Sequence, residues 1–193
     1  MVLDTDALVV AIVSILLFLA LCAALVTVTV SLRRPADLPL LVAAGLVVLC
    51  LIVVAVVPVD VPTPFGVLLA VLGVALGVLG GDPVTRRVLA IATHGQVRDG
   101  AAGGILVTDA ADAGDAQEVM RGGTTIGYLE RLASLAAIVA GFPEAIAVVV
   151  ALKGIGRFSE LATPAARERF IVGTMSSLLW ACLVGAVVRL AIW

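Results

Sequence analysis

The sequence predicts an all-α integral membrane protein with four transmembrane helices, one re-entrant helical hairpin, and both termini outside the cytoplasm. Hydrophobic residues make up 62% of the 193 residues and charged residues only 13%. Soluble domains average about 45 to 50% apolar and about 25% charged residues. Apolar runs follow one another along the chain, and the basic residues gather in the segments between them. These two observations predict the class.

Three apolar runs in the first 80 residues are long enough, or nearly so, to span a bilayer, which takes about 20 residues. They cover residues 7–30, 38–57 and 65–80, with 61–64 extending the third. Asp4 and Asp6 stand where a signal peptide would be basic, so the first run is expected to be a retained span. Arg33 and Arg34 between spans one and two belong on the cytoplasmic side, which places the N-terminus outside.

Residues 81–125 form the only long polar segment and are expected on the cytoplasmic side. Val84, Val88 and Ile91 follow a helical spacing, which predicts a short interfacial helix over residues 83–98. The rest is rich in Gly, Ala and Asp and predicts a flexible acidic loop, with a brief extended piece at residues 105–108. Its acidic spacing does not match a calcium loop. A solvated loop is the first interpretation, and contact with an ion or basic partner is the second.

The next apolar stretch, residues 129–157, allows two topologies. As one span it would leave eight basic residues inside and four outside, and the protein would have five plain spans with a cytoplasmic C-terminus. As a hairpin that reverses at residues 141–143 it leaves eleven inside and only Arg189 outside, of the 12 in the chain. The positive-inside rule favours the hairpin.

The local residues also favour a reversal at this point. Glycine at position 141 can end a helix in a left-handed conformation, and Pro143 followed by Glu144 is typical of a helix start. A hairpin centred near residue 142 brings Glu130 level with Lys153 and near Arg157. Each arm, 126–140 and 143–157, has 15 residues and measures about 22 Å, so the tip is expected inside the membrane.

Residues 170–193 are the last predicted span, with Arg189 and Trp193 at its outer end. The predicted organisation is therefore a three-span N-terminal bundle at residues 1–80, the cytoplasmic segment 81–125, and a C-terminal unit at 126–193 that holds the hairpin and the final span.

Three motifs, "IGYLER", "GFPEAIAVVVALKGIGRFSEL" and "ERFIVGTMSSLLWA", lie between Gly122 and Ala181. They resemble the C-terminal region of an uncharacterised family, a domain of unknown function, of bacterial multi-pass membrane proteins. The N-terminal half is not matched and lacks the intramembrane histidine and aspartate element of that family. The resemblance implies motif positions but no reaction, and these positions are Glu130, Arg131, Lys153, Arg157, Glu160, Glu168, Gly173, Thr174 and Ser177.

Ionisable residues at membrane depth are the candidate functional residues, because each is costly to insert and by default pairs or does work. Glu130 with Lys153 or Arg157 is interpreted as a buried ion pair that fixes the hairpin, or else as a substrate, lipid-headgroup or proton site. Glu144 is interpreted as a helix-start carboxylate that reaches outside water, or as a protonatable group.

Small residues recur on two of the predicted spans at spacings that suit close helix packing. Gly66, Ala70, Gly73 and Gly77 lie on one face of the third span, and Gly173 and Ser177 begin a similar series on the last one. A separate set of basic residues, which could hold anionic lipid on the cytoplasmic face, is Arg86, Arg87, Arg157, Arg167 and Arg169.

The leading functional hypothesis is a small non-enzymatic subunit or scaffold of an assembly in the bacterial plasma membrane. The alternatives are a transporter or channel-like protein that uses the charges of a broken helix, and a lipid-headgroup binder. The expected partners are the bilayer, a protein or second copy, and anionic lipid. The charge distribution gives no reason to expect nucleic-acid binding. The cysteine and histidine spacing predicts no metal site, no cofactor and no catalytic set.

Overall fold

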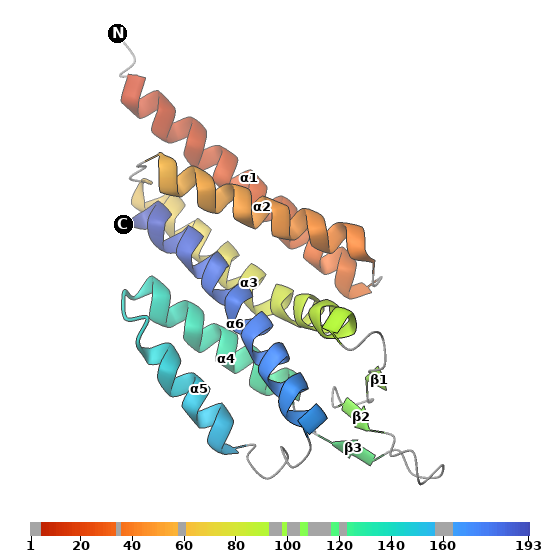
Figure 1. Cartoon of the computed structure of the whole chain (residues 1–193). Coiled ribbons are helices and arrows are strands. Elements are labelled where there is room, and N and C mark those ends of the chain that lie inside the picture. Colours follow the sequence, from red (N-terminus) through yellow and green to blue (C-terminus); the bar gives the residue numbers. More distant parts are fainter. Residues whose placement is uncertain are drawn as a thin grey trace.

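Helices make up most of the structure, which is a computed structural model. The structure describes residues 5–33, 36–57, 61–92, 98–99, 105–107, 117–119, 123–156 and 164–193. Four helices among them are long and apolar enough to cross a membrane: α1 (Thr5–Arg33), α2 (Asp37–Val56), α3 (Thr63–Ala92) and α6 (Pro164–Ile192). The predicted helical membrane protein with four long apolar helices is confirmed at this level. The start of α1 and the end of α6 lie toward the same end of the bundle (Figure 1).

α1 and α2 are joined by a short connection and run antiparallel on one side of the bundle (Figure 1). Their shared core comes from buried residues spaced three or four apart, as helical seams require: Leu17, Leu21, Ala24 and Val28 on α1, and Ala43, Val47, Cys50 and Val54 on α2. Other large apolar side chains, such as Leu16 and Leu41, remain exposed. That surface is suited to contact with lipid.

α3 and α6 pack against each other in opposite directions, with glycines of α3 at the contact. A Cβ on Gly66 would lie 3.4 Å from Ile192, near the end of α6, and one on Gly80 would lie 2.7 Å from the indole of Trp180. Missing side chains let the two backbones approach, which is how helices gain packing energy where lipid already solvates apolar groups.

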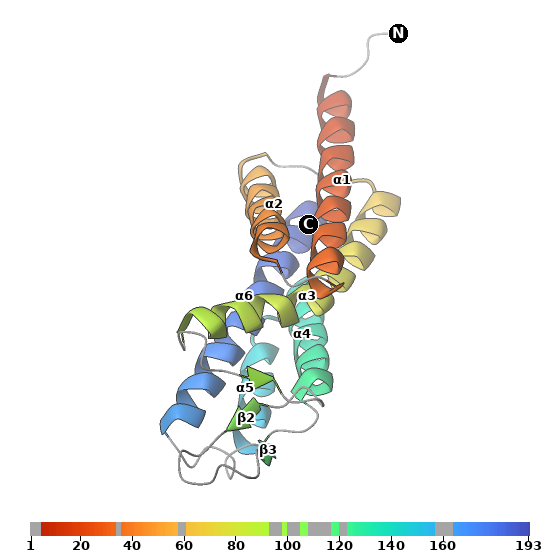
Figure 2. The same cartoon turned by 90° about the vertical axis from the view of Figure 1, so that its right-hand side faces the viewer.

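The structure corrects the predicted end of the third span. That span was expected to stop at Gly80, with a separate interfacial helix over residues 83–98, but α3 continues through Pro83 to Ala92. Figure 2 shows the last part of α3, in green, turning to run across the bundle. Proline has no N–H and its ring crowds the carbonyl four residues earlier, so it bends a helix without ending it here. The predicted domain boundary at 80/81 therefore falls inside a helix, and His94 lies outside the described residues.

Three short strands follow α3 and add a small sheet to the predicted all-α fold. β1 (Arg98–Asp99), β2 (Ile105–Val107) and β3 (Gln117–Val119) pair antiparallel in that order. Leu106 lies opposite both Arg98 and Glu118. β2 falls where a brief extended piece was expected. Asp109, Asp112 and Asp115 lie outside the described residues.

Residues 129–157 do not form one helix. α4 (Gly123–Val139) and α5 (Ala145–Gly156) are separate helices that fold back on each other (Figure 1). Gly141 has a φ of +77°, and the N–H groups of Gly141 and Phe142 donate to the carbonyls of Ile138 and Ala137 at 3.0 and 2.8 Å. This pair of bonds is a Schellman motif, which ends a helix with glycine in the left-handed conformation.

Candidate functional site

Glu130 of α4 and Lys153 of α5 form an ion pair at the open end of the hairpin. The Nζ of Lys153 lies 2.6 Å from Oε2 of Glu130, with 16% and 8% of the two side chains exposed. The same ammonium lies 5.7 Å from the ring centroid of Phe170, at the start of α6. Arg157, the other predicted partner of Glu130, lies outside the described residues, as does Glu160.

Arg131, the next residue of α4, points to the interface of α3 and α6 and is only 3% exposed. Its Nε donates to the carbonyl of Val78 on α3 at 2.9 Å, and its Nη1 donates to Oγ of Ser177 on α6 at 2.9 Å. Its guanidinium carbon lies 5.2 Å from the ring centroid of Tyr128. One arginine therefore joins three helices, which a flexible lysine with a single ammonium would do less well.

Glycines make room for the Arg131 side chain. A Cβ on Gly81 would overlap Cδ of Arg131, and a Cβ on Gly127 would lie 3.3 Å from Nη1. The aliphatic part of the arginine therefore lies directly on the backbone of α3. The pair Gly80-Gly81 ahead of Pro83 is the sequence signal for this close contact, and neither glycine was among the predicted packing residues.

Two donors from other helices bond to carbonyls of α3 shortly before its bend. Arg131 bonds to Val78 O, and Nε1 of the buried Trp180 donates to Leu76 O at 3.2 Å. Pro83 has no N–H to donate to the carbonyl four residues earlier, and the two bonds are made to carbonyls of the turn just before this weakened point. α3 is thus held at its bend by α4 and α6 together. Trp180 was not among the predicted site residues.

The predicted packing residues lie at helix contacts. Gly66 and Gly73 face Ile192 and Val188 of α6, whereas a Cβ on Gly77 would lie 2.6 Å from Leu135 of α4. Gly173 lies opposite Thr85 and Leu89 of α3 at ordinary contact distance. Ser177 of α6 accepts the hydrogen bond from Nη1 of Arg131.

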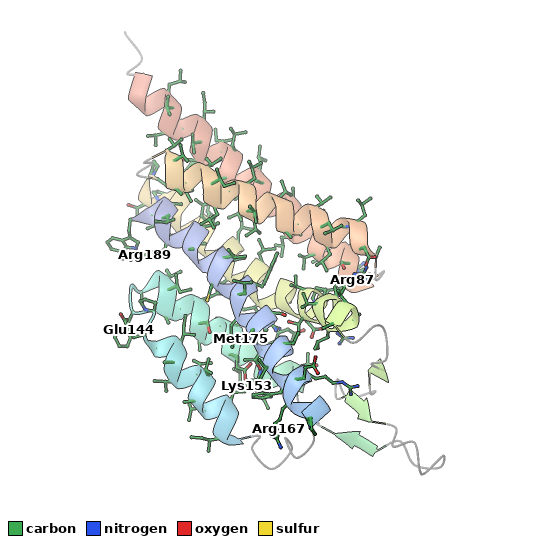
Figure 3. All side chains as sticks on the ribbon, viewed as in Figure 1. Arg87, Glu144, Lys153, Arg167, Met175 and Arg189 are labelled. Carbon is green, nitrogen blue, oxygen red and sulfur yellow. The ribbon has the colours of Figure 1, made fainter. Side chains whose placement is uncertain are left out.

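The tip of the hairpin brings Glu144 and Arg189 to the same end of the molecule (Figure 3). Glu144 is exposed. Its carbonyl accepts a hydrogen bond from the N–H of Ala147, in the first turn of α5, at 3.0 Å. Arg189 and Trp193 were expected together at the outer end of the last span. Nη1 of Arg189 donates to Val139 O at 3.2 Å, and its guanidinium carbon lies 4.9 Å from the ring centroid of Trp193. α6 therefore caps the end of α4.

The predicted basic face is divided between separate places. Arg86 and Arg87 at the end of α3 form exposed ion pairs with Asp82 at 3.1 Å and Asp37 at 2.7 Å. Arg167 is exposed and Arg169 is half-buried, both in the first two turns of α6. Figure 3 shows Arg87 and Arg167 well apart. These arginines do not converge on one site.

Comparison of the chain with protein-family models, with curated proteins and with solved structures finds no match. Among the described residues, the charged groups at the junction of α3, α4, α5 and α6 hold helices together: Lys153 binds α5 to α4, and Arg131 binds α4 to α3 and α6.

Proposed function

We propose that this protein is a small, non-enzymatic, multi-pass subunit or scaffold of an assembly in the bacterial plasma membrane. The outer surface of α5 carries the proposal. Its twelve residues measure about 18 Å, too short to cross a bilayer alone. None of them is buried, and Val148, Leu152 and Ile155 are 59%, 66% and 77% exposed. An apolar helix that buries so little of its surface against the rest of the protein is suited to packing against another membrane protein.

The inner side of α5 is fixed in place, which suits a docking surface. Lys153 binds Glu130 on α4. α4 is in turn bonded to α3 and α6 through Arg131. The three charged side chains thus support the position of α5 relative to the long helices. A surface that is ordered before binding costs less free energy to engage than a mobile one.

We infer further that the hairpin enters and leaves on the cytoplasmic side, with both chain termini outside. The positive-inside rule supports this, since eleven of the 12 basic residues then lie inside. The tip lies beside Arg189 near the outer end of α6, where arginine and tryptophan are common in membrane proteins. In this orientation Glu144 is a helix-start carboxylate at the outer interface. The resemblance of residues 122–181 to bacterial multi-pass proteins also supports a membrane role.

Site-specific photo-crosslinking in intact cells tests the subunit role. A photoreactive amino acid replaces Leu152 on α5 or, as a matched control, Leu41 on α2, since the two side chains are 66% and 68% exposed. We expect a discrete protein adduct from position 152 and none from position 41, which faces lipid. Lipid adducts alone from both positions would overturn the proposal.

Cysteine labelling from the two sides of the membrane tests the topology, in a variant whose three native cysteines are replaced by alanine. Cysteines at Gly156 and Trp193 mark the end of α5 and the end of the chain. We expect an impermeant maleimide to reach position 193 from outside and position 156 only after the membrane is opened. The reverse pattern would overturn the hairpin topology.

A further inference from the structure

One nitrogen of the Arg131 guanidinium is not used in its hydrogen bonds to α3 and α6. Nε and Nη1 donate to Val78 O and Ser177 Oγ, whereas Nη2 is fully covered and has no hydrogen-bond partner among the described residues. A buried donor without an acceptor costs about 1 to 3 kcal/mol, and more when it is charged. The other covered charged atom without a partner among the described residues is Oε1 of Glu130, whose carboxylate already pairs with Lys153, so Nη2 is left without an acceptor.

Among the described residues, no carboxylate forms an ion pair with Arg131, although Asp82 and Glu130 interact favourably with its charge at longer range. Its neighbour Glu130 forms its ion pair with Lys153, and Asp82 forms its ion pair with Arg86. The two groups bonded to Arg131 among the described residues, a carbonyl and a hydroxyl, are both neutral. Buried charges in proteins are normally paired, because an isolated one is expensive to desolvate.

A second covered donor lies close by on α3. Thr85 Oγ1 is buried and, within the described part of the chain, also lacks a hydrogen-bond partner. Thr85 is one helical turn beyond Gly81, on which Arg131 lies, and its methyl group faces Gly173, one turn before Ser177 on α6. The hydroxyl of Thr85 and the guanidinium of Arg131 thus lie one turn apart along the same α3–α6 contact.

We propose that Arg131 Nη2 and Thr85 Oγ1 bind a small monovalent anion, a halide or the carboxylate of a small acid, between α3 and α6. One guanidinium matches one negative charge, whereas a divalent phosphate or sulfate would leave a buried excess of negative charge. Gly81 and Gly127 leave room for the guanidinium at this place, since a Cβ on either residue would meet it. The site goes beyond the proposed subunit role and does not depend on it.

Thermal unfolding of the purified full-length protein in detergent tests the site. The unfolding midpoint is measured against increasing sodium chloride, bromide, acetate or sulfate, and the four salts are compared at equal ionic strength. We expect a saturable rise with the halides, with acetate, or with both, and none with sulfate, because a ligand that binds only the folded state stabilises it. The anions that raise the midpoint distinguish a halide site from a carboxylate site. The same curve for all salts would overturn the proposal.

Threonine variants show whether the effect arises at this site. Thr85→Val removes the hydroxyl and should raise the anion concentration needed for half-saturation by about tenfold or more. Thr85→Ser keeps the hydroxyl and should respond like the unmodified protein. Thr27→Val is the matched control, since the bonds that Thr27 Oγ1 makes within the described residues go to carbonyls of its own helix, Ala23 and Ala24. An identical response of Thr85→Val and Thr27→Val, or loss of the response in Thr85→Ser, would overturn the assignment.

Discussion

Glu130 and Lys153 are 23 residues apart in the chain, and their charged groups lie 2.6 Å from each other. Along one continuous helix the same residues would be about 35 Å apart. The contact forms because α4 ends at a left-handed glycine and the chain turns back as α5. The ion pair therefore closes the end of the hairpin opposite to its turn. Substitutions at the two ends should show how much each contributes to the stability of the protein.

Breaking this pair from one side should destabilise the protein strongly. Glu130→Gln leaves the Lys153 ammonium buried without a carboxylate, and removing one partner of a buried pair costs about 3 to 5 kcal/mol. The double variant Glu130→Gln with Lys153→Met should recover much of that loss, because no charge remains unpaired. The free energy of unfolding in detergent, measured as a double-mutant cycle, gives the coupling energy.

An exposed pair of the same chain provides the control for that cycle. Arg87 and Asp37 are 2.7 Å apart with 47% and 58% of their side chains exposed. Arg87→Gln should change stability by about 1 kcal/mol or less, because solvent screens such pairs. Equal losses of unfolding free energy from Arg87→Gln and Glu130→Gln would contradict the prediction that the buried pair of the hairpin contributes more to stability than the exposed pair.

Gly81→Ala should destabilise the junction of α3 and α4. The new Cβ would overlap Cδ of Arg131, so the arginine must move and its bond to Val78 O is strained or lost. A loss of about 1 to 3 kcal/mol is expected from such overpacking. Gly45→Ala in α2 is the control, since nothing lies within 4 Å of its Cβ position. It should be neutral or stabilising by up to about 1 kcal/mol. Thermal unfolding of the two variants side by side measures the difference.

The long helices could be predicted from sequence because their signal is local. The first run, 7–30, becomes α1 at Thr5–Arg33, and the second, 38–57, becomes α2 at Asp37–Val56. The reversal after α4 is also local, since glycine followed by Phe-Pro limits the backbone at one point of the chain. Composition and short-range backbone chemistry are sufficient for features of this kind.

The course of α3 and the partners of Arg131 could not be predicted in this way. A proline usually marks a helix start or break, whereas α3 continues through Pro83 and packs against α6 on both sides of it. Arg131 bonds to a carbonyl 53 residues away and to a serine 46 residues away. Such contacts depend on the tertiary arrangement: the pair Gly80-Gly81 indicates a close approach on α3, but it does not say which side chain fills the space. Of the small sheet, only β2 falls where an extended piece was expected; β1 and β3, with two and three residues, are too short to give a sequence pattern.

Gly141→Ala should loosen the turn between α4 and α5. A φ of +77° costs a residue with a Cβ about 1 to 2 kcal/mol, and this Cβ would also approach Arg189 Nη2 to 3.0 Å. Gly154→Ala in α5 is the matched control, because nothing lies within 4 Å of its Cβ position. The unfolding midpoint should fall for the first variant and stay or rise for the second. Equal midpoints would show that the turn does not need glycine.

Arg189→Gln should free the hairpin tip without unfolding the bundle. The guanidinium donates to Val139 O, the carbonyl at the end of α4. A hydrogen bond to a charged group contributes about 1.5 to 3 kcal/mol, so its loss should raise local opening of the tip about tenfold or more. Hydrogen exchange of the Phe142 amide, which bonds to Ala137 O at 2.8 Å, reports that opening. Arg167→Gln, at the opposite end of α6, should leave this amide unchanged. Equal exchange at Phe142 in both variants would mean that Arg189 does not hold the tip.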